Sequence, residues 1–155
     1  MGCGPGTNAG MFPHARYLGV DLDPAYVKRA TARFGPRFAV GDAAALDVKG
    51  FAPVDAMLVN SLCHHLTDDQ LRSMLVRTEL VAPGGYLHLI DLHLPGRGIP
   101  EYLARADRGE HPRSRLHLSG IVAERWEIDV EDPFWLTVAG VRLWAMVYIR
   151  AKPRS

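Results

Sequence analysis

The sequence predicts an α/β fold built on a mostly parallel sheet, and three observations support this fold class. Short β-type runs alternate with amphipathic helical segments between residues 17 and 91, which is typical of strands joined by helical crossovers. A glycine-rich run, G-C-G-P-G at residues 2–6, stands at the head of this series, where a tight turn is needed. Two β-type segments without a convincing helix between them end the chain, which favours an antiparallel pair at the sheet edge.

The first half of the chain is expected to alternate in a regular way. A helix should begin just after the glycine run, over residues 7–12. A second helix is better marked, because Asp23 can cap its start, Pro24 suits its first position and Gly35 stops it. The expected strands of this half cover residues 17–21, 37–40 and 54–59.

The second half is less regular. Thr67 and Gln70 form a capping-box pattern at the start of a helix that we expect to run to about residue 81. A turn at residues 82–85, A-P-G-G, then leads into the next strand. The remaining expected elements are strands at residues 86–91, 121–130 and 143–151, a possible helix at residues 99–106, and a strand break at Asp132-Pro133.

Length and composition are those of an ordinary globular protein. With 155 residues, of which 48% are hydrophobic and 23% charged, the chain is expected to form one domain. A net charge of +1 gives no reason to expect nucleic acid or a membrane as a partner. Because we find neither an apolar run of spanning length nor a signal-peptide pattern, we expect a cytoplasmic location. Cys3 and Cys63 make neither a disulfide framework nor a metal cluster, so no metal is expected.

The glycine-rich run gains its meaning from Asp21, which ends the strand that follows it. In open α/β sheets the amides of such a turn approach an adenosine-containing ligand, and a carboxylate at the end of the next strand accepts hydrogen bonds from ribose hydroxyls. Asp21 is therefore our candidate ribose ligand. The alternative is a solvated turn residue, because the run D-L-D-P at residues 21–24 also suits helix entry. Asp23 is expected to be only the helix cap.

Together with the threonine that follows, the run Gly2-Cys3-Gly4-Pro5-Gly6-Thr7 resembles motif I of the class I S-adenosylmethionine (SAM)-dependent methyltransferases, usually D-x-G-C-G-x-G. The A-P-G-G-Y run at residues 82–86 is similar to that family's L-x-P-G-G turn. The resemblance implies a Rossmann-like, doubly wound sheet in a single SAM-binding domain over residues 1–155. Only Met1 precedes the motif, so by the family's pattern we expect a fold lacking its N-terminal helices and first strand, through a late start or a real shortening.

The resemblance also implies which residues hold the cofactor, S-adenosyl-L-methionine. The G-D-A triplet at residues 41–43 resembles the family's third motif, whose aspartate binds the adenine amino group. Leu22 would lie against the adenine face, and Asn60 would touch the methionine part of the cofactor. The full expected set is Gly2, Cys3, Gly4, Gly6, Asp21, Leu22, Gly41, Asp42, Ala43, Asn60, Ser61 and His65.

Candidates for a general base are few. The H-H-L run at residues 64–66 resembles the family's H-H-L run, in which we expect His64 to pack or cap and His65 either to face the cofactor or to be solvated. His88, Asp91 and His93 are expected to alternate along one face of a strand, with His88 deepest, in the core or at the edge. The candidates are therefore His65, Asp91 and His93, and a structural role stays open for each.

The segment at residues 96–120 is expected to be a variable insert on the substrate side. Its arginines could cover the active site and attract an anionic substrate, although a solvated face is the simpler interpretation. These arginines are Arg97, Arg105, Arg108, Arg113 and Arg115.

The activity that the resemblance implies is methyl transfer from SAM to a small-molecule acceptor. The protein would align the nucleophile, the methyl carbon and the sulfur, and would exclude water. One alternative is a truncated or degenerate methyltransferase fold that binds a partner without activity. Another is a nicotinamide-dependent oxidoreductase, which the sequence disfavours because Thr7 stands where G-x-G-x-x-G needs its third glycine. The methyl acceptor, its reacting atom and the oligomeric state stay open.

Overall fold

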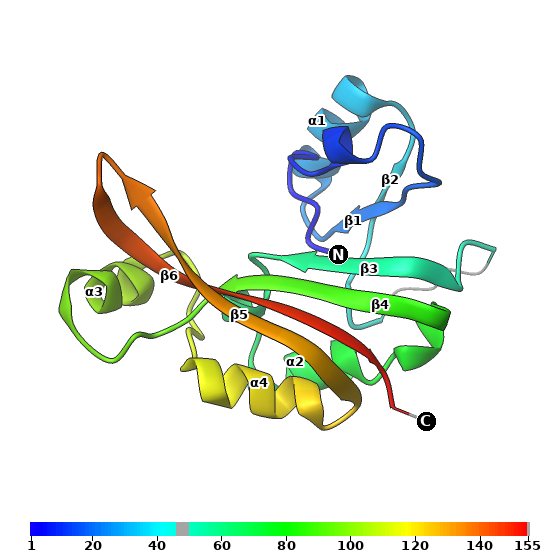
Figure 1. Ribbon diagram of the computed structural model, residues 1–155. Coiled ribbons are helices and arrows are strands. Elements are labelled where there is room, and N and C mark those ends of the chain that lie inside the picture. Colours follow the sequence, from blue (N-terminus) through cyan, green and yellow to red (C-terminus); the bar gives the residue numbers. More distant parts are fainter. Residues whose placement is uncertain (46–49, 155) are drawn as a thin grey trace. The chain divides into compact units, whose positions relative to one another are not determined.

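The computed structural model describes residues 1–45 and 50–154, and the chain divides into two compact units, residues 1–51 and residues 52–155. Figure 1 labels the elements of both units. Within the described residues no helix combines the length and the apolar character needed to cross a membrane.

The first unit contains a single β-α-β motif. Strand β1 (Gly19–Asp21) pairs in parallel with β2 (Phe38–Val40), and helix α1 (Pro24–Phe34) connects them. The helix forms as the sequence predicts: an Asp23 carboxylate oxygen accepts a hydrogen bond from Ala25 N at 2.7 Å, and Gly35 ends the helix at φ 82°. The helix expected over residues 7–12 is reduced to one 3-10 turn, η1 (Ala9–Met11).

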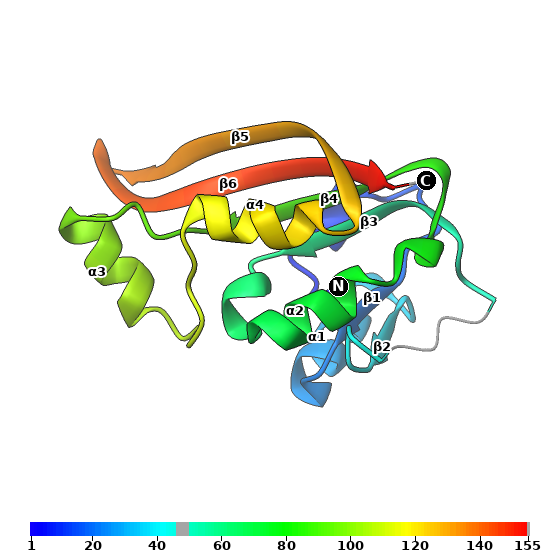
Figure 2. The same cartoon turned by 90° about the horizontal axis from the view of Figure 1, so that it is seen from below.

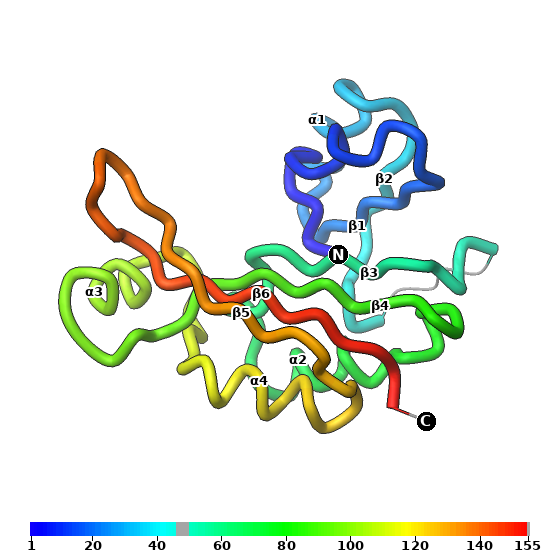
Figure 3. The backbone as a smooth tube through the Cα atoms, viewed as in Figure 1, coloured from blue at the N-terminus to red at the C-terminus, as the bar shows by residue number. Residues whose placement is uncertain are grey.

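The second unit contains a four-stranded sheet in the order β3-β4-β6-β5. β3 (Val54–Asn60) and β4 (Val81–Leu92) are parallel, whereas β6 (Val141–Pro153) is antiparallel to both of its neighbours. β5 (Trp126–Val138) lies at the edge. The tube in Figure 3 follows β5 and β6 as one long hairpin, which turns at Ala139 and Gly140 with φ 48° and 81°. The predicted α/β class and the antiparallel strand pair are confirmed.

The helices α2 (Asp68–Leu75) and α4 (Arg115–Ala123) cover the same face of this sheet (Figures 1 and 2). The predicted capping box starts α2, since Thr67 Oγ1 accepts from Gln70 N at 3.2 Å and Gln70 Oε1 accepts from Thr67 N at 2.8 Å. The possible helix expected at residues 99–106 is present as α3 (Gly98–Ala106), and it lies against β6. The core under α2 and α4 consists of fully buried side chains of both layers: Leu71, Met74, Leu75, Leu87, Leu89, Leu118 and Trp126.

Two helix predictions were wrong. α2 ends at Leu75 instead of about residue 81, because the chain passes through the 3-10 turn η3 (Thr78–Leu80) and Val81 already pairs with Val54. α4 was missed entirely. Its β-branched residues Ile121 and Val122 favoured a strand, but they form the buried face of a helix that Ser114 caps.

Two strand predictions also need correction. Pro133 does not interrupt β5, which continues to Val138 with Pro133 opposite Val147. An edge strand tolerates proline, because its outer side needs no amide donor. The A-P-G-G turn lies inside the bounds of β4, where Val81 pairs with Val54 and Tyr86 with Ala56, so that residues 82–85 loop out of the ladder.

Candidate functional site

The glycine loop of the first unit is pressed against β1 and α1. Cys3 N donates to Val20 O at 3.0 Å, and this hydrogen bond holds the loop on strand β1. Gly6 has φ 83°, and a Cβ built on it would lie 3.0 Å from Phe34 Cδ2, so a side chain there would strain the backbone and crowd the helix. Gly4 also has a positive φ, 51°, but its Cβ position points into open space. The loop is thus fixed on one side and open to a ligand at Gly4.

Asp21 closes this loop. Its Oδ2 accepts from Gly4 N at 2.8 Å and its Oδ1 accepts from Asp23 N at 3.0 Å. A carboxylate has about four acceptor positions, so each oxygen keeps capacity for a further donor such as a ribose hydroxyl. Asp23 is occupied as the cap of α1, as predicted.

The other residues predicted to bind cofactor in the first unit lie after the two strands. Leu22 is 66% exposed, which leaves its apolar side chain free to contact a ligand. Gly41 N donates to Asp21 O at 3.0 Å, and Asp42 Oδ1 accepts from Ala44 N at 2.8 Å. Asp42 therefore stabilises its own turn with one oxygen, and no described residue donates a hydrogen bond to the other.

In the second unit the chain turns sharply where β3 ends. Ser61 has φ 51°, a left-handed conformation that costs energy for a residue with a Cβ and is common at functional sites. Ser61 N donates to Ile90 O at 2.8 Å, which holds the turn on β4. The turn presents Asn60 and Ser61, both predicted cofactor residues, at the carboxyl end of β3.

Asp91 anchors the loop that follows this turn. It is fully buried, and its oxygens accept from Cys63 N at 2.6 Å and from Leu92 N at 2.8 Å, while Oδ1 lies 2.5 Å from His64 Nδ1. Burial, followed by the nearby Asp91 charge, raises the pKa of the Cys63 thiol well above its usual range, so Cys63 is no nucleophile. We assign Asp91 no role as a general base, because its oxygens are inaccessible and taken by these donors.

His88 does not share a face with Asp91, contrary to the prediction. His88 and Asp91 are an odd number of residues apart, and Asp91 belongs to the buried face with Leu87 and Leu89. His88 lies on the other face, where its Nδ1 is 2.9 Å from the Tyr148 hydroxyl. Burial and Arg150 lower the pKa of His88, which acts as the predicted structural histidine.

His64 is buried and His65 is exposed, and their rings lie 4.2 Å apart between centroids. Burial of its ring and the neighbouring His64 lower the pKa of His65, so its imidazole is neutral and can accept a proton at neutral pH. His93 follows β4 and is half-buried, with Nδ1 3.3 Å from Leu94 O.

Arg113 was missed as a buried residue, because its segment appeared to be a solvated, arginine-rich face. The residue is only 7% exposed. Its Nε donates to Asp68 Oδ1 at 2.7 Å, and its Nη1 donates to Cys63 O at 2.7 Å. Two other arginines of the segment are paired as well, Arg105 with Glu101 and Arg115 with Glu131. The partners of Arg113 lie 45 and 50 positions away in the chain, so no local sequence pattern indicates the role of this residue.

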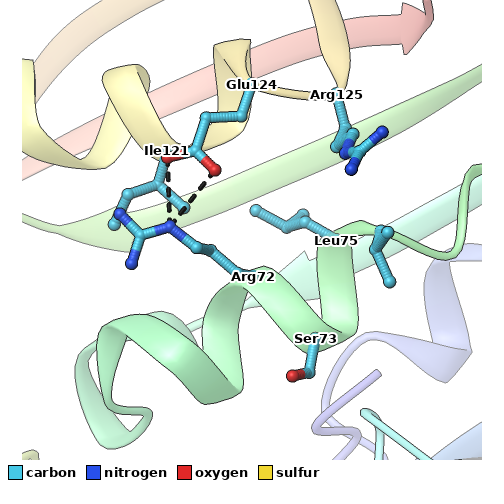
Figure 4. Close-up of a pocket in the computed structure, with 7 residues that line it drawn as sticks. Arg72, Ser73, Leu75, Ile121, Glu124 and Arg125 are labelled. Atoms are coloured by element: carbon cyan, nitrogen blue, oxygen red, sulfur yellow. Dashed lines mark hydrogen bonds and ion pairs between the residues drawn. The ribbon is translucent and has the colours of Figure 1, made fainter.

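A surface pocket of ≈ 280 Å³ lies between the last turn of α2 and the end of α4. Figure 4 shows the guanidinium of Arg72 directed toward the Glu124 carboxylate, two of the residues that line the pocket. Arg72 Nε donates to Glu124 Oε1 at 3.1 Å. This end of α2 is fixed by Trp126, whose Nε1 donates to Leu75 O, beside the amino end of β4. Ligands of open α/β sheets bind at the carboxyl ends of strands, so the pocket is separate from the candidate site. Among the described residues, no group of three or more His, Cys, Asp or Glu is placed to hold a metal.

Comparison with known proteins agrees with this arrangement of loops and strands. Residues 1–85 match the family model described as a methyltransferase domain, and the chain belongs to this family. It is 33% identical over 140 residues to trans-aconitate 2-methyltransferase of Methylobacterium radiotolerans. The alignment covers 86% of this chain and 46% of that protein. The chain therefore spans about half the length of this curated relative.

Solved structures share the fold. A SAM-dependent methyltransferase of Methanosarcina mazei aligns with a TM-score of 0.78 at 19% identity, over 99% of this chain and 91% of the other. The N-methyltransferase NodS of Bradyrhizobium japonicum, in complex with S-adenosyl-L-homocysteine, aligns with a TM-score of 0.75 at 18% identity, over 99% and 76% of the two chains. The predicted Rossmann-like class is confirmed by these likenesses.

Proposed function

We propose that this protein transfers a methyl group from S-adenosyl-L-methionine to a small-molecule acceptor. The observation that supports the proposal most directly is the glycine loop closed by Asp21, with Gly4 N 2.8 Å from the carboxylate. It gains weight from the family, because the model of the methyltransferase domain matches the residues that carry this loop.

The residues present fit the cofactor. The Cβ position of Gly4 points into open space, so a ligand can approach the loop backbone there. Asp21 keeps acceptor capacity for ribose hydroxyls, and exposed Leu22 offers an apolar surface. One carboxylate oxygen of Asp42 accepts no hydrogen bond from any described residue. The bound cofactor would supply a methyl group made electrophilic by its sulfonium. In the second unit, Asn60, Ser61 and His65 are the proposed contacts at the end of β3.

The protein's own contribution to such a displacement is to orient the acceptor and exclude water. An acceptor that must lose a proton needs a base, and we propose His65 for that role. Its ring is exposed, and its lowered pKa keeps it neutral. His93 stays a second candidate, at the end of β4 and half-buried.

The acceptor is proposed to be a small molecule, with no nucleic acid or membrane partner. The curated relative is named for a methyl transfer to trans-aconitate, so a carboxylic acid is the first acceptor to test. The proposal also includes a single SAM-binding domain over residues 1–155 and a cytoplasmic location. The nicotinamide-dependent alternative finds no support in the family match.

The direct test is transfer of a labelled methyl group. The 155-residue chain is incubated with SAM that carries a radioactive methyl group and with trans-aconitate, followed by a panel of small acids, amines and phenols. We expect labelled product with at least one acceptor, and its loss in Asp21→Ala. A folded chain that binds S-adenosyl-L-homocysteine but labels no acceptor would favour the degenerate, non-catalytic alternative.

A further inference from the structure

Residues 107–113, between α3 and α4, lie directly on the loop that contains His64 and His65. His111 N donates to His64 O at 2.9 Å, and Arg113 Nη1 donates to Cys63 O at 2.7 Å. A third donor, Arg113 Nη2, lies 2.5 Å from Leu66 O. One short segment thus donates to three backbone carbonyls, those of residues 63, 64 and 66, in the loop at residues 62–66, which we call the histidine loop.

Gly109 makes the closest approach. A Cβ built on this residue would lie 2.1 Å from His64 Cδ2 and 2.6 Å from His64 O. Real Cβ atoms do not come so close to a backbone oxygen, so any side chain at position 109 must displace either the segment or the loop. Gly109 is needed here for space alone.

The His64 ring is consequently enclosed from several directions. Asp91 holds its Nδ1 at 2.5 Å, Gly109 lies against its Cδ2 edge, and Asp107 Oδ1 is 3.9 Å from its Nε2. The exposed His65 ring lies against it, tilted by 39° at a centroid distance of 4.2 Å. A displacement of His64 would therefore move His65, whose ring forms no hydrogen bond or ion pair with any residue that the structure describes.

We propose that residues 107–113 position the histidine loop for cofactor binding, with Gly109 and Arg113 as positioning residues. The inference rests on the proposed function, because it takes His65 and its neighbours Asn60 and Ser61 to contact the cofactor. Residues 107–113 belong to the segment that the sequence predicted to be a substrate-side insert. By this proposal they also support the cofactor side of the site. Neither residue is catalytic, since each acts through the loop.

The test compares two glycine-to-alanine substitutions in the same part of the chain. Gly109→Ala introduces the Cβ against His64, whereas Gly120→Ala adds one in α4, where nothing lies within 4 Å. Calorimetric titration with S-adenosyl-L-homocysteine should give a dissociation constant about tenfold or more above wild type for Gly109→Ala and an unchanged one for Gly120→Ala. Affinities of Gly109→Ala and Gly120→Ala within about twofold of each other would overturn the inference.

A second readout separates positioning from a loss of stability. The pKa of His65, followed by NMR of its imidazole, should rise in Gly109→Ala, because a displaced His64 neither buries nor repels the His65 ring as before. A purely structural role would lower the melting temperature and leave this pKa unchanged, which would also overturn the inference. If Gly109→Ala does not fold, Arg113→Lys serves instead, since lysine keeps the charge but lacks the planar fork that reaches Cys63 O and Leu66 O.

The two proposals can fail separately. If the folded wild-type chain binds no S-adenosyl-L-homocysteine, the proposed function fails, and the His65 titration alone then decides whether residues 107–113 position the loop. If wild type binds and Gly109→Ala binds equally well, the proposed function stands and the positioning role is overturned.

Discussion

Asp91 Oδ1 lies 2.5 Å from His64 Nδ1, which joins the carboxyl end of β4 to the loop that follows β3. The two residues are 27 positions apart in the chain, and both are buried. Oδ2 of the same carboxylate accepts from Cys63 N, so one side chain fixes two consecutive residues of the loop. Asp91 therefore acts by shaping the loop, which agrees with the structural role that the sequence left open beside that of a general base.

Asp91→Asn should lower the free energy of unfolding by about 2–3 kcal/mol, because an amide cannot accept from Cys63 N and from His64 Nδ1 at once and leaves a buried donor unpaired. Urea denaturation measures the change. Asp69→Asn is the control, since the Asp69 side chain is 97% exposed and its loss should cost no more than about 0.5 kcal/mol. Equal stability of the two variants would contradict the anchoring role of Asp91.

The lowered pKa of His65 makes stability depend on pH in a definite direction. Burial of the ring, and then the neighbouring His64, disfavour the protonated form of His65 in the folded state and lower its pKa. Arg108 also lowers this pKa, whereas Asp91 and Asp107 raise it. The unfolded chain therefore binds the proton more readily, and this contribution to stability is lost as the pH falls through about 6.5 toward the folded pKa.

NMR titration of the folded chain should place the pKa of His65 below the value that the same residue has in the chain unfolded by concentrated urea. His65→Gln, which removes the titrating group, should reduce the loss of stability between about pH 7.5 and about pH 5. A folded pKa of His65 at or above the unfolded value would show that the ring is not held against His64 as described.

Arg113 is expected to be important for stability in spite of its charge. Arg113→Ala removes donors from the carbonyl oxygens of Cys63, Leu66 and His111, and should cost about 3 kcal/mol in the free energy of unfolding. Arg105→Ala is a matched control, because that arginine is 62% exposed and, among the described residues, its ion-pair partner is Glu101 one helical turn away. Comparable losses in both variants would mean that Arg113 is not the internal anchor described above.

Elements with local signals could be predicted from the sequence. α1 was expected because Asp23, Pro24 and Gly35 mark its ends within the chain itself, and α2 was located by its capping box. The parallel and antiparallel pairing of the later strands followed from whether a helix separates them. In each case the residues that decide the structure are close neighbours in sequence.

The features that escaped prediction depend on distant partners. Arg113 is bound to Asp68 and Cys63, 45 and 50 positions earlier, and Asp91 to His64, 27 positions earlier. Nothing in the sequence around Ser61 indicates a left-handed backbone, because the turn at the end of β3 imposes this conformation. α4 was missed because the buried face of a short helix, rich in β-branched residues, resembles the start of a strand.

The most direct measurement is calorimetric titration of the 155-residue chain with S-adenosyl-L-homocysteine. The account predicts a dissociation constant of about micromolar order for wild type and binding weakened about tenfold or more in Asp21→Ala, which loses the ribose acceptor and the partner of Gly4 N. Asp23→Asn removes a charge two residues away, keeps the helix cap and should bind like wild type. No binding by the folded wild-type chain, or equal binding by Asp21→Ala, would contradict the assignment of this loop as the cofactor site.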